Sequence, residues 1–206
     1  MKLRRPHPSL AAALIAALLL VFPSNADAHL AIKGAGDFGN GALHPLVMPQ
    51  HLMIVLGLAL LLGMRVPLRL KLPMVSLAIS SAIALGVVSF VQFSPPELPL
   101  TLIAMVLGLL VAIGRTLPPA ALAGICAICA VAVGLDSGVD PESGMVVWKT
   151  LSGTWLGVTG VTGYLALAVS NGAEKNWART GMRILGSWIF AIAILMLAFA
   201  LRSKAG

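Results

Sequence analysis

The length of the apolar runs constrains this chain most. Six segments after residue 30 contain very few charged residues, and each is close to the ~20 residues that a helix needs to cross a bilayer. They cover residues 46–64, 73–93, 98–114, 117–135, 146–170 and 183–201. Polar and apolar residues do not alternate in them, as they would in the strands of a membrane barrel. Because lipid cannot satisfy an unpaired backbone group, these segments favour helices.

The composition points to the same class of protein. Hydrophobic residues make up 59% of the 206 residues and charged residues 10%, against roughly 45–50% and 25% in soluble domains. A water-soluble globule of this size cannot bury so much apolar surface, and a disordered chain would have the opposite composition. We therefore predict an all-α membrane protein, in which a signal peptide precedes a single domain, residues 29–206, built as a bundle of six transmembrane helices.

The first 28 residues are typical of a secretory signal peptide. A basic start precedes an apolar stretch at residues 10–22 that is too short to span comfortably, and residues 26–28 (Ala-Asp-Ala) supply the small residues of a cleavage site. Cleavage after Ala28 makes His29 the first residue, with a free amine beside an imidazole, which is a pair that can bind a metal. A solvated His29 and an uncleaved signal anchor are the alternatives.

The charges between the apolar segments predict an orientation. Basic residues gather in alternate breaks, at 65–72, 115–117 and 171–183, whereas most acidic residues lie in the other breaks. The positive-inside rule then predicts a multi-pass protein of a bacterial-type inner membrane, with both mature termini outside the cytoplasm. Arg202 and Lys204 stand against this rule. Since the basic residues occupy these breaks, we interpret the net charge of +7 as a signal of membrane topology. We therefore expect the chain to contact the lipid bilayer and not to bind nucleic acid.

The start of the first span carries the candidate site, because ionisable groups inside a membrane are costly. His44 and His51 are seven residues apart, so a straight helix puts them on one face but ~10.5 Å apart along its axis. Two prolines in this stretch predict a kink or a broken turn that brings the imidazoles closer. Met48 lies between them on the same face, and Gln50 precedes His51. Imidazole with thioether favours a borderline or soft transition metal, and a polar group satisfied by a neighbouring helix is the alternative for each histidine.

Two other groups of residues are weaker candidates. Asp136, Asp140 and Glu142 follow the fourth span on the predicted outer side, where they either attract cations or form an ordinary solvated loop. Cys126 and Cys129 form a C-x-x-C pattern inside the fourth span. Thiolates together with the histidines would suit copper(I) or zinc, but we favour two inert buried residues.

A family resemblance starts at the candidate site. The residues that carry it are Gly36, Phe38, Gly41, His44-Pro45 and His51. These residues, placed directly after a cleavable signal, resemble the start of the HupE/UreJ family of hydrogenase- and urease-accessory membrane proteins. The family pattern is His-Pro, two residues, Gly, one residue and Asp-His before an apolar helix. This chain has Met48 in place of the Gly and Gln50 in place of the Asp. In a second family motif, at 134–142, aspartates replace histidines while Glu142 is kept.

The resemblance implies uptake of nickel, or cobalt, for metalloenzyme maturation, without a tightly bound cofactor. We therefore expect a secondary permease for a divalent transition metal, with His44 and His51 as ligands on the entry path, and metalloenzyme maturation proteins as partners. Met48 and Gln50 would tune selectivity. The departures from the motif keep two alternatives open, namely a non-transporting accessory partner of a metalloenzyme or redox complex, and a permease for a softer metal such as copper. No phosphate-binding loop or metalloprotease motif occurs, so we expect no enzyme activity.

Overall fold

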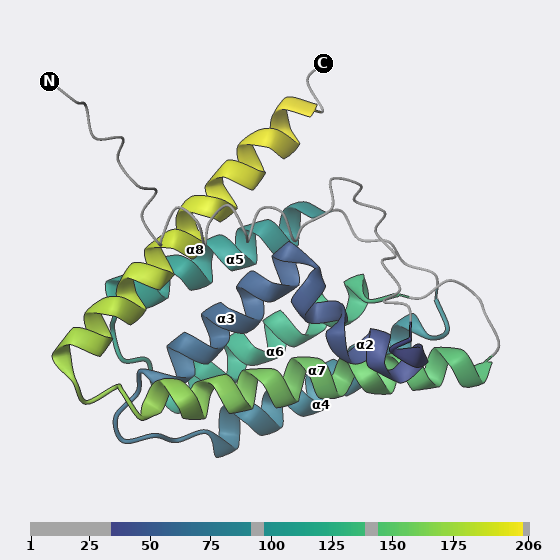
Figure 1. Cartoon of the computed structure of the whole chain (residues 1–206), viewed down its shortest axis with the longest axis horizontal. Coiled ribbons are helices and arrows are strands. Elements are labelled where there is room, and N and C mark those ends of the chain that lie inside the picture. Colours follow the sequence, from purple (N-terminus) through teal and green to yellow (C-terminus); the bar gives the residue numbers. More distant parts are fainter. Residues whose placement is uncertain (1–33, 92–96, 139–143, 204–206) are drawn as a thin grey trace, which may run out of the picture. The chain divides into compact units, whose positions relative to one another are not determined.

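The structure, a computed structural model, describes residues 34–91, 97–138 and 144–203, which form α-helices and no strand. In chain order the helices are α2 (Gly36–Val47), α3 (Pro49–Gly63), α4 (Lys71–Val88), α5 (Glu97–Ile113), α6 (Pro119–Asp136), α7 (Gly144–Ser170) and α8 (Asn176–Ser203) (Figure 1). The prediction of an all-α protein is confirmed. The signal peptide, His29, Asp140 and Glu142 lie outside the described residues.

The helices differ in how well they suit a membrane. Helices α4, α6 and α8 are long and apolar enough to cross one, and so is the bent pair of α2 and α3 taken together. Helix α5 is apolar over the shorter stretch Leu98–Ile113. Helix α7 is 27 residues long, but its many glycines and threonines make it less apolar. The described residues therefore contain up to four clear spans, and a bundle of six remains a prediction, although each predicted segment contains a helix.

Two predicted boundaries are corrected by the structure. Helix α8 begins at Asn176, so Arg179 and Arg183 lie in its first turns, not in a loop at 171–183. Helix α6 includes Asp136 as its last residue, which we had placed in the following loop. The prediction ended each span where the apolar residues end. A helix continues beyond that point because its backbone hydrogen bonds do not depend on apolar side chains.

Helix α3 is the most buried helix of the described part of the chain. Its neighbours include α5, α7 and α8, and its largest fully buried apolar side chains are Ile54, Val55, Leu58 and Leu62. A helix that is hydrophobic on all sides is expected to lie in the interior. Around it, α2 packs on α7, α4 packs on α6, and α5 packs on α8 (Figure 1).

Helix α7 approaches α2 through glycines. A Cβ atom added to Gly153 would overlap the carbonyl oxygen of Phe38, and one added to Gly157 would overlap that of Ala42. Gly41 of α2 is pressed in the same way against the backbone of α7. Small residues allow such close backbone approach between membrane helices. The small residues of α7 thus allow this close packing, and the packing holds α2 in place.

The basic connections gather at one end of the described bundle. Gly114, which follows α5, lies against the Arg183 side chain of α8, and Arg65 and Arg115 line one pocket. The connections that carry these residues lie at the left of Figure 1. His51 and Asp136 are at the other ends of α3 and α6. This separation agrees with the predicted alternation of basic and acidic breaks.

Candidate metal site at a broken helix

The candidate site forms where α2 ends and α3 begins. The two helices are bent by 75°, and Met48 between them has an extended backbone with φ −79° and ψ 117°. Pro49 explains the break, since proline disfavours a helical conformation for the preceding residue. Proline is also well suited to the first position of a helix, where its missing N–H would have no partner. The prediction of a broken turn is confirmed.

The bend brings His44 and His51 together. Their ring centroids are 5.1 Å apart and the ring planes meet at 68°, in an edge-to-face arrangement. A straight helix would have separated the two residues by ~10.5 Å along its axis. His44 lies in the last turn of α2 and is partly buried, whereas His51 lies in the first turn of α3 and is fully buried. The break thus places two imidazoles from separate helices against each other.

Asp136 joins this pair from a distant part of the chain. Its Oδ2 lies 2.9 Å from Nε2 of His51, across 85 residues of sequence. The Asp136 side chain is 18% exposed and that of His51 is not exposed. A carboxylate that accepts a hydrogen bond from one ring nitrogen fixes the orientation and tautomer of the imidazole. In that tautomer the other nitrogen, Nδ1, carries the lone pair.

Nδ1 of His51 is the atom best suited to bind a ligand. It is buried and forms no hydrogen bond within the described residues. Buried polar atoms are nearly always paired, so an orphan of this kind in a membrane helix is a candidate for function. An imidazole nitrogen held from behind by a carboxylate is the usual arrangement of a histidine that binds a metal.

Met48 and Gln50 border the same break. Met48 is partly buried and lies outside both helices, so our argument that it shares a helix face with the histidines is wrong. That argument assumed a continuous helix through residue 48. Gln50 is partly buried in the first turn of α3.

The donors do not surround a single point. Among the described residues, no group of three or more His, Cys, Asp or Glu side chains is arranged to hold a metal ion. His44, His51 and Asp136 instead form a row of imidazole, imidazole and carboxylate. Such a row suits a path along which an ion is passed better than a closed structural site, in which four ligands meet around the ion.

Cys126 and Cys129 lie in the apolar core of α6. Both are fully buried and neither forms a disulfide. Their neighbours in this core are aliphatic side chains of several helices. This placement agrees with two inert residues, the interpretation that we favoured.

Replacing both cysteines by serine tests their role. We expect unchanged metal uptake by the C126S/C129S variant, because a serine hydroxyl inside a helix can bond the carbonyl four residues back. Uptake per molecule, at membrane abundance matched by immunoblot, is the measurement. Loss of the uptake of one metal only would place the thiols on its path and would favour a soft ion such as copper(I).

A comparison with known protein families shows to which family the chain belongs. A family model described as "HupE / UreJ protein" matches residues 16–196. The chain belongs to the HupE/UreJ family. The match includes the broken helix and most of α8, and it confirms the resemblance seen at His44 and His51. Together with the apolar helices, it makes this HupE/UreJ protein a membrane protein of a nickel/cobalt accessory family. Neither the curated proteins nor the solved structures contain a match to the chain.

The contact between Asp136 and His51 was not predicted. We had placed Asp136 in an outer loop, where it either attracts cations or is an ordinary solvated residue. One signal in the sequence points to the contact, since the ends of the first and fourth spans that carry these residues face the same predicted side. That signal places many residues on one side and does not select this pair.

Proposed function

We propose that this HupE/UreJ protein is a secondary permease that carries a divalent transition-metal ion, nickel first and cobalt next, for the maturation of a metalloenzyme. The observation that carries the proposal is the broken helix, which brings the ring centroids of His44 and His51 to 5.1 Å and leaves Nδ1 of His51 without a hydrogen bond among the described residues. Discontinuous helices form the substrate sites of many secondary transporters. Membership of the family supports nickel or cobalt as the cargo.

In this proposal the residues at and near the break have different roles. His44 and His51 offer imidazole nitrogens, which suit divalent nickel and cobalt, and Asp136 holds the ring of His51. Met48 and Gln50 at the break tune selectivity. Asp140, Glu142 and His29 add donors or negative charge on the outer side. In this orientation, with the basic connections in the cytoplasm and both mature termini outside, a cation is captured from outside.

Cellular metal accumulation tests the proposal directly. We expect cells that express the chain to accumulate nickel, and to a smaller extent cobalt, above cells with an empty vector at trace supply of metal. Mass spectrometry across nickel, cobalt, copper and zinc gives the result and names the cargo. Equal contents of every metal in the two cell lines would contradict the permease. A rise in the cellular content of copper alone would show that the cargo is a softer ion than nickel.

A second function is favoured by the small number of donors. Since no group of three such ligands forms among the described residues, we propose as the alternative a non-transporting membrane partner that helps to assemble a metalloenzyme or a redox complex. This reading predicts a stable partner in pull-down experiments and no metal flux in proteoliposomes. Flux through the purified protein alone would exclude it.

A further inference from the structure

Thr162 of α7 is a buried polar residue to which the function proposed above gives no role. Its side chain is fully buried, and its Oγ1 has no hydrogen-bond partner among the described residues. The hydroxyls of Thr154 and Thr159 on the same helix donate to the carbonyl four residues back, at 3.1 Å and 2.6 Å, which is a common way to satisfy a threonine in a helix. Thr162 makes no such bond. Its Oγ1 therefore resembles Nδ1 of His51, as a buried polar atom suited to a ligand.

The neighbours of Thr162 along α7 indicate that it faces α3. A Cβ atom added to Gly63, at the end of α3, would overlap the carbonyl oxygen of Ala166. Ala166 follows Thr162 by four residues, so the two share a face of α7. Gly157, which precedes Thr162 by about a turn and a half, lies against Pro45 of α2. Thr162 therefore lies between the broken helix and the far end of α3.

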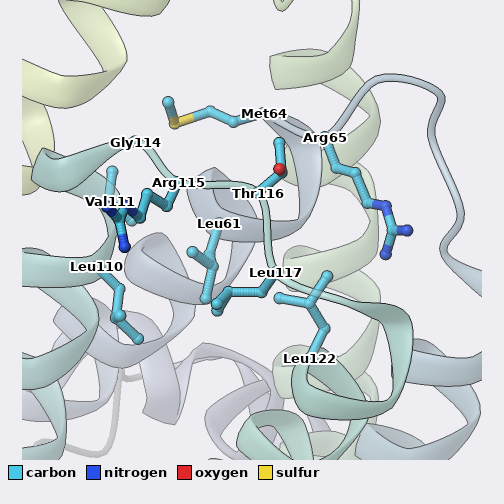
Figure 2. Close-up of a pocket in the computed structure, with 10 residues that line it drawn as sticks. All are labelled: Leu61, Met64, Arg65, Leu110, Val111, Gly114, Arg115, Thr116, Leu117 and Leu122. Carbon is cyan, nitrogen blue, oxygen red and sulfur yellow. The ribbon is translucent and has the colours of Figure 1, made fainter.

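The side of α3 that faces α5 and α6 is packed with apolar core residues. Leu107 of α5 lies against Gly57. At the far end of α3, Leu61, Leu110 and Leu117 help to line a cavity of about 10 Å³, which has room for about one water. Figure 2 shows these leucines lying between the helices. Aliphatic side chains cannot replace the waters of a divalent ion, so the side of α3 that faces the Thr162 hydroxyl is the better route.

We propose that Thr162 is the next residue that the metal ion meets after His51, and that its Oγ1 accepts a hydrogen bond from a water molecule bound to the ion. This inference rests on the permease proposed above, whose path it extends along the contact between α3 and α7. A hydroxyl oxygen has two lone pairs, and a bridging water binds almost as well as a direct contact. Because α3 and α7 touch closely at Gly63, the ion passes when the two helices separate, as in alternating access.

Uptake by the T162V variant tests the assignment, because valine has the shape of threonine without the hydroxyl. We expect the initial rate of nickel uptake, divided by membrane abundance, to fall roughly tenfold, the effect of losing about one hydrogen bond to the passing ion. T162S keeps the hydroxyl and should stay within about twofold of the wild-type rate. T154V is the matched control, because Thr154 is also buried but its hydroxyl is paired within α7. Its rate should not change.

The unfolding temperature in detergent separates a role on the path from a role in the fold. T162V should be at least as stable as the wild type, because it removes an unpaired buried polar atom, so its lower rate would not come from unfolding. Should T162V fail to reach the membrane, T162A removes the hydroxyl without added bulk, and it is expected to lose uptake in the same way.

Several results would overturn the inference and leave the permease intact. These are wild-type uptake by T162V or T162A, a loss in T162S as large as that in T162V, and a loss in T154V as large as that in T162V. If cells with the wild type take up no more nickel than cells with the empty vector, the permease itself is wrong, and the role of Thr162 is wrong with it.

Discussion

Replacement of His51 by alanine abolishes nickel uptake while the protein remains in the membrane; this is the largest effect that we expect. The imidazole is fully buried, one of its nitrogens is held by Asp136, and the other forms no hydrogen bond with the part of the chain that the structure describes. No other described side chain occupies the same place, so the variant loses the donor outright. We expect H44A to behave in the same way, because its ring packs edge-to-face on that of His51.

Substitution of Asp136 by asparagine should have a smaller effect of the same kind. The amide oxygen can still accept a hydrogen bond from Nε2, but it no longer supplies the negative charge that makes the imidazole a better ligand. Loss of the carboxylate behind a metal-binding histidine typically lowers metal affinity or activity by about 10- to 100-fold. D37N is the matched control, because Asp37 lies in the first turn of α2 and is removed from the histidine pair by two helical turns.

The initial rate of uptake at trace nickel, divided by membrane abundance, measures these effects. If H44A and H51A both took up nickel at the wild-type rate, the broken helix would not be part of the transport path. An equal loss in D37N and D136N would show that general negative charge on this side of the protein matters, and that the contact with His51 does not.

The second large effect concerns the packing of α2 on α7. We expect G157A and G153A each to destabilise the protein by about 1–3 kcal/mol, the usual cost of overpacking. The added methyl group meets backbone carbonyls of α2 in both cases, and a backbone carbonyl cannot turn aside as the end of a flexible side chain can. Helix α2 must therefore move as a whole, and His44 moves with it.

G160A is the matched control on the same helix. There a new methyl group would touch only the Leu156 side chain, at 3.8 Å, which is an ordinary contact. Since alanine is the better helix former, this variant should be as stable as the wild type or up to ~1 kcal/mol more stable. Unfolding followed by helical circular dichroism in detergent gives the comparison. Equal stability of G157A and G160A would show that α2 and α7 are less closely packed than the structure has them.

Displacement of α2 should also reduce uptake by the molecules that remain folded. The geometry of the two imidazoles depends on where α2 lies, so G157A should lower the rate per molecule, whereas G160A should not. This outcome would connect the glycine packing of α7 to the site. A G157A protein that is less stable but carries nickel at the wild-type rate would show that the packing supports only the fold.

The sequence by itself determined the class of protein, the helices and the break between His44 and His51. These features follow from local physics. A run of apolar residues satisfies its backbone in lipid only as a helix, and Pro49 ends the helical conformation at Met48. The two histidines are close in sequence, so a bend between them was enough to predict that they approach each other.

Only the tertiary structure decided which distant residues meet. Asp136 contacts His51 across 85 residues, and Arg65 shares a pocket with Arg115. Neither contact is encoded in a local pattern, because apolar spans of similar composition can pack beside one another in many orders. The close approach of α7 to α2, set by Gly153 and Gly157, selects one of these arrangements. Hydropathy predicts which side of a membrane a residue faces, and only packing between helices chooses its partner.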